Sequence, residues 1–274
     1  MSVKIASIEV DTLSRKKVIT KIGKAIENHK ILQVVTPYSE FVVEAEYNLE
    51  FRKALNSSEI RIPDGIGILW AGAYLAGKWN NLITSLVSII NRDINLYSVF
   101  TEKISGSDLI YDVLDLAHKQ KSRVYLLGGE GIVTERVKDY IQNTYSRIHI
   151  TGTYSKKISL NDTDLFQQVL DSQSDIVLIA LSYPKQEIFA SQLKQYFINN
   201  NHKGVILCIG GTFDFLAGTK KRAPKLLQRL GLEWLYRLIQ QPKRIRRIYK
   251  ATIEYIFLIS KYKSNIDKSK DDTV

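Results

Sequence analysis

The feature that most constrains this chain is the alternation of short β-branched apolar runs with longer amphipathic stretches. Apolar runs of this length predict buried strands, and the stretches between them carry the apolar period of helices. Strands that alternate with helices build a parallel sheet covered on both faces. We therefore expect an α/β fold with a Rossmann-like parallel sheet flanked by helices.

The boundaries follow from these runs and from the polar residues beside them. The candidate strands are Val3–Val10, Ile31–Thr36, Ile60–Ile62, Arg123–Leu127, His149–Thr151, Ile176–Leu181 and Val205–Ile209. The candidate helices are Lys16–Glu27, Glu40–Leu55, Asp108–Lys119, Thr134–Asn143, Asp164–Ser172 and Lys185–Gln195. Asp11 and Ser39 stand where helix N-caps are expected, because short oxygen-bearing side chains accept hydrogen bonds from the first backbone amides.

The positive charge is concentrated in one segment. The net charge is +11, and residues 220–250 alone hold eleven Lys or Arg and a single acid, Glu233. The remainder is close to neutral, with the mixed composition of a globular protein. We therefore divide the chain into an α/β domain over residues 1–219, a basic appendage over 220–263 and a polar, disordered tail over 264–274.

The basic appendage also carries an apolar stripe at helical spacing. Its members before Pro242, which breaks or kinks the run, are Leu227, Leu230, Trp234 and Leu238; those after it are Ile245, Ile248, Tyr249, Ile253, Ile256 and Phe257. A helix with one apolar and one basic face suits an anionic membrane surface. Two other interpretations stay open, namely a basic surface on a core helix and a nucleic-acid-binding surface.

Several classes of protein are disfavoured. One cysteine, Cys208, and four histidines allow neither an intramolecular disulfide nor a Cys/His metal cluster. Cys208 lies in an apolar run, so we expect a small buried hydrophobe. The N-terminus does not resemble a signal peptide, and no run reaches the ~18 apolar residues that would span a bilayer. We expect a cytoplasmic protein.

The long apolar stretch Tyr74–Phe100 fits this pattern less well. It predicts either a short amphipathic helix that packs on the core or a flap that touches a lipid acceptor.

Unusual motifs follow directly after the candidate strands. They are Thr36-Pro37, Pro63-Asp64-Gly65-Ile66-Gly67, Gly128-Gly129, Ser182-Tyr183-Pro184-Lys185-Gln186-Glu187 and Gly210-Gly211-Thr212-Phe213-Asp214. The carboxyl ends of parallel strands share one edge of the sheet, where ligands bind in open α/β folds. We expect these motifs to converge on one crevice.

Asp64 is the sharpest candidate for chemistry. A carboxylate on a tight turn can act as a general base, although it can equally cap the following helix. The glycine pairs allow backbone amides to approach a phosphate, but neither pair completes a dinucleotide-binding or P-loop motif. An ordinary dinucleotide enzyme or NTPase is therefore disfavoured.

Seven ordered motifs over residues 3–250 resemble the bacterial WecG/TagA/CpsF glycosyltransferase family. Besides the strand-end motifs, they are Asn56-Ser57-Ser58, Ile104-Ser105-Gly106-Ser107-Asp108, the extension through Phe215-Leu216-Ala217-Gly218, and Arg222-Ala223-Pro224 running into Gln228–Arg237. The resemblance implies an inverting, metal-independent transferase without a cofactor. Its donor would be a UDP-sugar, N-acetylmannosamine or related, and its acceptor a polyprenyl-diphosphate-linked sugar in cell-surface polysaccharide or teichoic acid synthesis.

The resemblance also implies roles for individual residues. Asp64 resembles the catalytic base, Thr36 its neighbour in the acceptor pocket, and Gln186 an amide of that pocket. Arg237, Arg244 and Arg247 resemble appendage arginines that close over the site and engage the donor diphosphate. The remaining substrate-binding candidates are Lys103, Gly128, Gly129, Lys185, Gly210, Gly211, Phe213 and Asp214. The appendage would dock on the inner face of the cell membrane.

Three departures from the family pattern surround the acceptor side, and one is the insertion Tyr74–Phe100, which is longer than in the compact members of the family. Tyr38-Ser39 stands where the family has Asn after Thr-Pro, and Glu102-Lys103 replaces Glu-Arg. Lysine keeps the charge without the planar fork of arginine. Two alternatives to the transferase are a nucleic-acid-binding module, which we disfavour, and a catalytically silent nucleotide-binding protein.

Overall fold

A six-stranded parallel sheet forms the centre of the molecule. The computed structural model describes residues 1–221, 223–224, 236, 238–239, 242 and 245–271. The strands are β3 (Leu32–Val35), β4 (Ile60–Arg61), β5 (Arg123–Gly128), β6 (His149–Tyr154), β7 (Ile176–Ala180) and β8 (Val205–Cys208). They are parallel and lie in the order β4-β3-β8-β7-β5-β6. The predicted α/β fold is confirmed.

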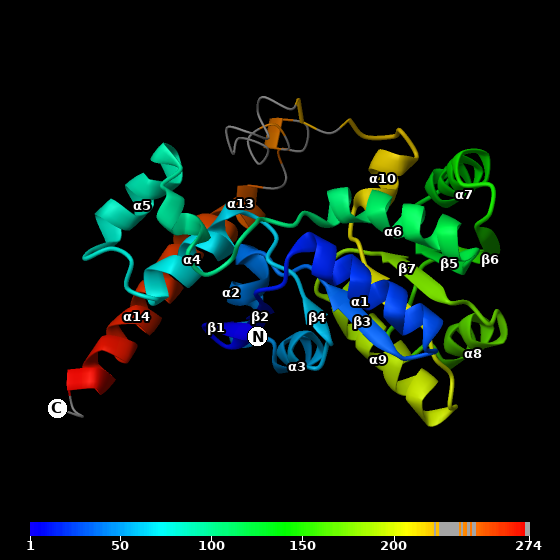
Figure 1. The fold of residues 1–274 in the computed structure, drawn as a ribbon, viewed down its shortest axis with the longest axis horizontal. Coiled ribbons are helices and arrows are strands. Elements are labelled where there is room, and N and C mark those ends of the chain that lie inside the picture. Colours follow the sequence, from blue (N-terminus) through cyan, green and yellow to red (C-terminus); the bar gives the residue numbers. More distant parts are fainter. Residues whose placement is uncertain (222, 225–235, 237, 240–241, 243–244, 272–274) are drawn as a thin grey trace.

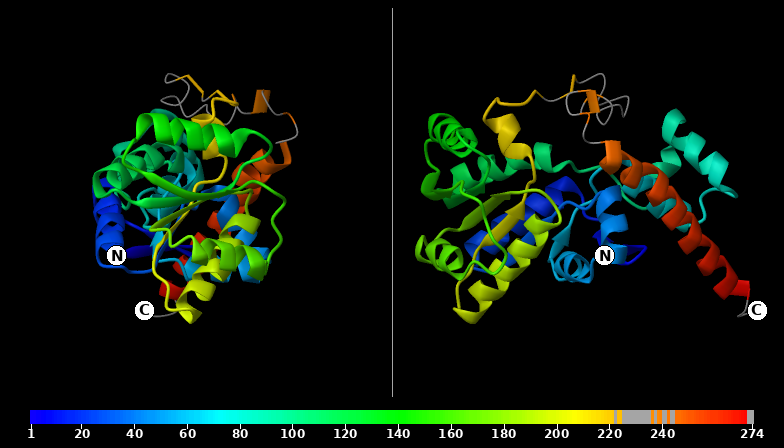
Figure 2. Two further views of the ribbon diagram at one scale, coloured as in Figure 1. Left: turned by 90° about the vertical axis from the view of Figure 1, so that its right-hand side faces the viewer. Right: turned by 180° about the vertical axis from the view of Figure 1, so that it is seen from behind.

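Helices cover both faces of this sheet (Figures 1 and 2). One face packs on α1 (Arg15–Glu27), α6 (Gly106–Gln120) and α7 (Val133–Thr144), and the other on α8 (Thr163–Asp171) and α9 (Lys185–Asn199). Successive strand residues point to opposite faces. Val34 therefore belongs to the core cluster under α1, α6 and α7, and Val35 to the cluster under α8 and α9. Both faces of the central strands β7 and β8 are buried, which explains why these strands are apolar throughout, whereas the edge strand β6 is only partly buried and more polar.

The predicted strand Val3–Val10 is wrong as a single element. The chain forms an antiparallel hairpin instead, β1 (Ser2–Ile5) paired with β2 (Ile8–Asp11), and Ala6 turns between them at φ +53°. This hairpin is a separate sheet. Asp11 does not cap α1: the cap is Ser14, and Asp11 accepts the Arg61 amide at 2.7 Å.

The predicted helix Glu40–Leu55 is two helices, α2 (Ser39–Tyr47) and α3 (Leu49–Asn56). Asn48 separates them, because its extended backbone leaves the helical region and its side chain caps α3 by accepting the Phe51 amide at 3.0 Å. Ser39 is the first residue of α2 rather than its cap, which is Tyr38.

A second group of helices, which we call the helical end, lies away from α7 and α8 (Figures 1 and 2). Its members are α4 (Ile66–Leu75), α5 (Leu82–Asn91), the 3₁₀ turn η1 (Ile94–Tyr97), α13 (Ile245–Tyr249), the π-helical turn η3 (Lys250–Glu254) and α14 (Tyr255–Asp271). α14 continues past residue 264, where the sequence suggested a disordered tail. No helix in the described part of the chain is long and apolar enough to span a membrane.

Candidate active site

Two strand-end segments and the start of a helix meet at Gly106. Thr36 follows β3, Asp64 follows β4, and Gly106 begins α6. The Gly106 amide donates to Asp64 Oδ2 at 3.5 Å, and a Cβ added to Gly106 would lie 3.3 Å from Thr36 Cγ2. The predicted pair Thr36 and Asp64 is thus brought together at the amino end of α6, where the helix dipole favours an anion.

The backbone holds the Asp64 turn from both sides. The Asp64 amide donates to Pro37 O at 3.0 Å, and the Ile104 amide donates to Pro63 O at 3.0 Å. Asp64 does not cap α4, because the N-cap is Gly65 and no side chain makes the capping bond. Backbone hydrogen bonds on both sides therefore hold the turn that carries the carboxylate.

The two glycines after Asp64 each have a structural reason. Gly65 adopts φ +90°, a conformation that other residues rarely take. Gly67 leaves room for α2, because an added Cβ would lie 2.2 Å from Ser39 Oγ. The Tyr255 hydroxyl donates to Gly67 O at 3.1 Å, which joins α14 directly to this turn.

Gln186 braces the ends of two neighbouring strands. Its Oε1 accepts the Leu181 amide at 3.1 Å and the Gly210 amide at 2.8 Å, and its Nε2 donates to Glu187 Oε1 at 2.7 Å. The side chain is buried, and both ends of its amide are engaged. Gln186 thus fixes the loops after β7 and β8 relative to each other.

The glycine pairs show similar internal bonding. The Gly129 amide donates to Ala180 O at 3.2 Å, and the Gly210 amide donates to Gln186. Gly128, at φ +101°, would place an added Cβ 2.3 Å from Ala180 O. The contact with Ala180 O explains Gly128 by close packing of β5 on β7, whereas a Cβ added at Gly210 would meet nothing within 4 Å. A phosphate bound at these loops would need other donors than the Gly129 and Gly210 amides.

Glu187 is fully buried beside this brace. Burial raises its pKa to about 7, although the hydrogen bond from Gln186 opposes the shift. Glu187 Oε2 has no hydrogen-bond partner. Cys208 is also buried, as predicted, and burial raises the pKa of its thiol.

The other candidates lie around these loops. Phe213 is buried, with Cδ2 3.4 Å from a Cβ added at Gly129. Lys185 donates to Ile158 O, and Asp214 Oδ2 accepts from Lys220 Nζ at 2.6 Å. Both side chains are therefore engaged within the protein. Lys103 and Gly211 are exposed.

A buried carboxylate, Glu40, joins the appendage to the start of α2. Arg247 Nε and Nη2 each lie 3.0 Å from a Glu40 carboxylate oxygen, and Arg247 Nη2 donates to the Tyr38 hydroxyl at 2.7 Å. The hydroxyls of Tyr38 and Tyr183 also donate to Glu40. We call Tyr38, Glu40, Tyr183 and Arg247 the Glu40 cluster.

The charges of the Glu40 cluster reinforce one another. Burial is the largest single influence and lowers the pKa of the Arg247 guanidinium, but the hydrogen bond to Glu40 and the charges of Tyr38, Glu40 and Tyr183 together raise it. Burial and then the Glu40 charge raise the pKa of Tyr38. Arg247 also lies over the Tyr183 ring, 4.9 Å from its centroid, in a cation–π contact.

Sequence reasoning missed Glu40 and Tyr183 as partners of Arg247. Glu40 looks like an ordinary first-turn acid, and its partner lies about 200 residues away in the chain. The one available signal was Tyr38, which departs from the family pattern and supplies a hydroxyl to this cluster. Arg237 and Arg244 lie outside the described residues.

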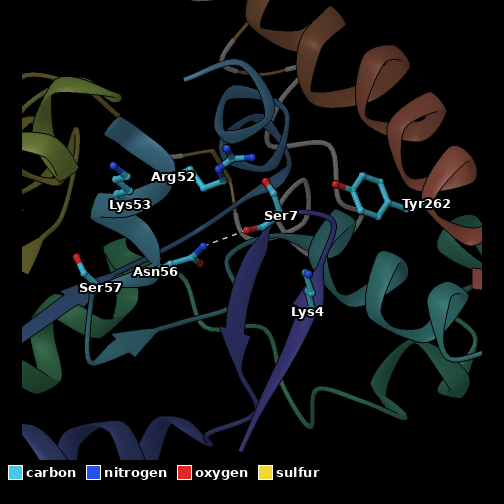
Figure 3. Close-up of a pocket in the computed structure, with 7 residues that line it drawn as sticks. All are labelled: Lys4, Ser7, Arg52, Lys53, Asn56, Ser57 and Tyr262. Atoms are coloured by element: carbon cyan, nitrogen blue, oxygen red, sulfur yellow. Dashed lines mark hydrogen bonds between the residues drawn. The ribbon is translucent and has the colours of Figure 1, made fainter. Parts of the chain in front are cut away.

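A cavity of about 610 Å³ lies elsewhere, between the β1–β2 hairpin, α3 and α14 (Figure 3). Its lining residues are Lys4, Ser7, Arg52, Lys53, Asn56, Ser57 and Tyr262. Asn56 Nδ2 donates to Ser7 O at 3.0 Å, so part of the Asn56-Ser57-Ser58 motif holds the hairpin. The cavity is on the amino side of β4, whereas Asp64 follows its carboxyl end.

Within the described ranges, no three His, Cys, Asp or Glu side chains gather as metal ligands would.

Comparison with known proteins supplies the family. The model of the glycosyl transferase WecG/TagA/CpsF family matches residues 3–92 and 93–269. An N-acetylglucosaminyldiphosphoundecaprenol N-acetyl-beta-D-mannosaminyltransferase of Bacillus subtilis is 30% identical over 256 residues, covering 93% of this chain and 86% of the relative. The protein of the same name from Bacillus spizizenii is 29% identical over 237 residues, covering 86% and 82%. The strand-end site described above is thus carried by a member of the WecG/TagA/CpsF glycosyl transferase family.

Proposed function

We propose that this glycosyltransferase moves N-acetylmannosamine from a UDP donor to N-acetylglucosaminyl-diphosphoundecaprenol, in cell-surface polysaccharide or teichoic acid synthesis. The observation that carries the proposal is the 30% identity to a relative with this named activity over 93% of the chain. The placement of Asp64 beside Thr36 supports it, because the carboxylate lies at a strand end and is held by backbone bonds.

We assign Asp64 as the general base of an inverting transfer. The acceptor hydroxyl oxygen attacks the anomeric carbon, and the bond from that carbon to the UDP oxygen breaks. The bonding electrons leave with UDP, and the hydroxyl proton passes to the Asp64 carboxylate. Thr36 lies at the same Gly106 amide and would orient the acceptor.

The departing UDP needs positive charge, which arginine supplies through paired hydrogen bonds. Arg237, Arg244 and Arg247 are the proposed donors. Since Arg247 is paired with Glu40 in the structure, its contact with UDP would follow an exchange of the carboxylate for the diphosphate. We assign Gln186 to positioning the loops around the donor, because its amide braces their backbones.

We place the enzyme at the inner face of the membrane, where a lipid-linked acceptor would be presented. Ile245, Tyr249, Ile253 and Phe257 are exposed on α13, η3 and α14 near the exposed Arg246. Apolar residues beside cations favour an anionic lipid surface over nucleic acid, whose phosphates offer no apolar contact.

Sugar transfer is tested with UDP-N-acetylmannosamine and a short-chain polyprenyl-diphosphate N-acetylglucosamine, with the product detected by mass spectrometry. Asp64→Asn should lower kcat by about 10²–10⁴-fold, since the amide cannot take the proton. An unchanged circular dichroism spectrum and melting temperature would show that the variant is folded. Full activity in that variant would exclude Asp64 as the base.

A further inference from the structure

The helix α5 is apolar on both of its faces. Leu82, Leu86 and Ile89 pack against the core cluster. On the other side, Ile83 is 75% exposed, Val87 45% and Ile90 80%. A helix on the surface of a globular protein usually turns polar residues outward. The apolar outer face of α5 is instead typical of a surface that contacts a membrane or another molecule.

The exposed apolar row continues beyond α5 into η1, where Ile94 is 80% exposed. The spacing of Ile83, Val87 and Ile90 is that of one helical face. This outward row is therefore continuous over the segment that the sequence singled out as an unusual apolar insertion. The helix packs on the core, which agrees with one of the two predictions for this segment. Its outer face, however, is not polar.

The charged side chains beside α5 are two cations and one acid. Residues 79–91 contain no charged side chain, and the exposed Lys78 and Arg92 flank them at the two ends. The nearest acid, Asp93, is engaged locally: it accepts from Trp79 Nε1 at 3.4 Å and from the Asn95 amide at 2.9 Å. Aliphatic residues between cationic ends, with aromatic side chains nearby, match the chemistry of an anionic bilayer interface.

The position of α5 connects this row to the catalytic turn. α5 packs on α4, and α14 packs on α4 as well, so both apolar elements belong to the same end of the molecule (Figures 1 and 2). α4 begins directly after Asp64-Gly65 and has ten residues, a length of about 15 Å. A membrane contact at α5 would therefore hold the Asp64 turn close to the headgroups.

We propose that α5 and η1 form a second membrane contact, separate from the appendage, in which Ile83, Val87, Ile90 and Ile94 enter the headgroup region of an anionic bilayer. The inference rests on the proposed function insofar as it explains how a lipid-linked acceptor reaches Asp64. A second copy of the chain fits less well as the occupant, since a two-fold pairing of α5 would bring together Lys78 and Arg92 of both copies, and the one adjacent acid, Asp93, is already bonded to Trp79 and Asn95.

The test measures binding of the full chain to vesicles of phosphatidylcholine and phosphatidylglycerol at a 7:3 ratio. The triple variant Ile83→Ser, Val87→Ser, Ile90→Ser should bind at least about a hundredfold more weakly, because each buried aliphatic side chain is worth roughly tenfold or more in partitioning. The matched control Leu49→Ser, Leu160→Ser, Ile198→Ser removes exposed aliphatic residues elsewhere and should bind like the wild type.

A site-specific probe keeps the proposal testable if the triple variant is unstable. Cys208 is buried, so Ile90→Cys introduces an accessible thiol for an environment-sensitive fluorophore. Its emission should shift to the blue on vesicles, whereas the same label at Ile198→Cys should not shift. An unshifted label at residue 90 on vesicles that bind the protein overturns the proposal.

Activity separates this inference from the proposed function. The triple variant should transfer sugar to a short-chain, water-soluble acceptor within twofold of the wild type, but lose transfer to a long-chain acceptor in vesicles. If the wild type acts on neither acceptor, the proposed function fails while the vesicle result still decides the membrane contact. Equal vesicle binding by the triple variant and the wild type overturns the contact. The contact is also overturned if the wild type and the matched control form a concentration-dependent dimer and the triple variant does not.

Discussion

The sheet and the helical end differ in how far their apolar side chains are buried. Around the sheet, strand and helix residues fill two core clusters and both faces are covered. At the helical end, α4 is buried, but α5, α13 and α14 leave Ile, Tyr and Phe side chains exposed. Burial therefore holds the sheet edge that carries Asp64, whereas the helical end leaves apolar side chains on the surface, as interaction sites do.

Specific polar contacts connect the appendage helices to the rest of the molecule. The Glu40 cluster connects α13 to the start of α2, and the Tyr255–Gly67 hydrogen bond connects α14 to the motif that carries Asp64. Substitutions at Glu40, at Glu187 beside the sheet and at Gly67 in α4 should therefore have distinguishable results.

The largest effect is expected from Glu40→Ala. Removing one partner of a buried ion pair costs about 3–5 kcal/mol, and partial exposure of Arg247 places the expected loss at the lower end. Hydrogen exchange of the α13 amides should accelerate by about a hundredfold, while exchange in β7 and β8 stays slow. Mass spectrometry of exchanged peptides measures this difference.

Glu44→Gln is the matched control, since Glu44 pairs with Lys250 on the same appendage but is more exposed. Its effect should be about tenfold or less. Equal acceleration in α13 and in the sheet after Glu40→Ala would show that the two regions are a single cooperative unit.

On the sheet side, Glu187 should make stability depend on pH. Its folded pKa is about 7 and its ordinary value is 4.5, so the folded chain binds the proton more tightly. The stabilisation is complete below pH 4.5 and is lost as the pH rises to 7, a change on the order of 3 kcal/mol. Chemical denaturation at pH 5 and pH 7.5 measures this loss.

Glu187→Gln should remove this part of the pH dependence, because glutamine has the same shape and no proton to lose. The exposed Glu50→Gln should leave the pH dependence unchanged. If the Glu187 variant retains the full loss between pH 5 and pH 7.5, another group is responsible.

The smallest effect is expected at Gly67, where α4 packs closely against Ser39 of α2. In Gly67→Ala the new Cβ would lie 2.2 Å from Ser39 Oγ, an overlap that should cost about 1–3 kcal/mol in unfolding free energy. Adding Ser39→Ala removes that oxygen and should restore most of the loss, since Ser39 Cβ lies 3.5 Å away. A double variant no more stable than Gly67→Ala would place the strain elsewhere.

Much of the fold could be predicted from local patterns. The central strands were recognisable because both of their faces are buried and their runs are apolar throughout. The errors at Val3–Val10 and Glu40–Leu55 arose at single residues, Ala6 and Asn48, where the backbone leaves the expected conformation. A period of apolar residues does not report such a local turn.

The site was predictable in part for the same reason. Thr36 and Asp64 follow neighbouring strands, so their approach follows from the geometry of a parallel sheet. The glycine pairs and Gln186 were harder to interpret, because a glycine that admits a phosphate and a glycine that admits another strand have the same sequence. Only the contacts with Ala180 O and the Gly210 amide distinguish these uses.

The sequence by itself determined the α/β class, the family and the positive charge of the appendage, since each depends on residue types in order along the chain. The tertiary structure alone decided the partner of Arg247, the bracing role of Gln186 and the outward face of α5. These depend on which distant residues become neighbours. An apolar residue in a helix carries no mark of which side the rest of the chain will cover.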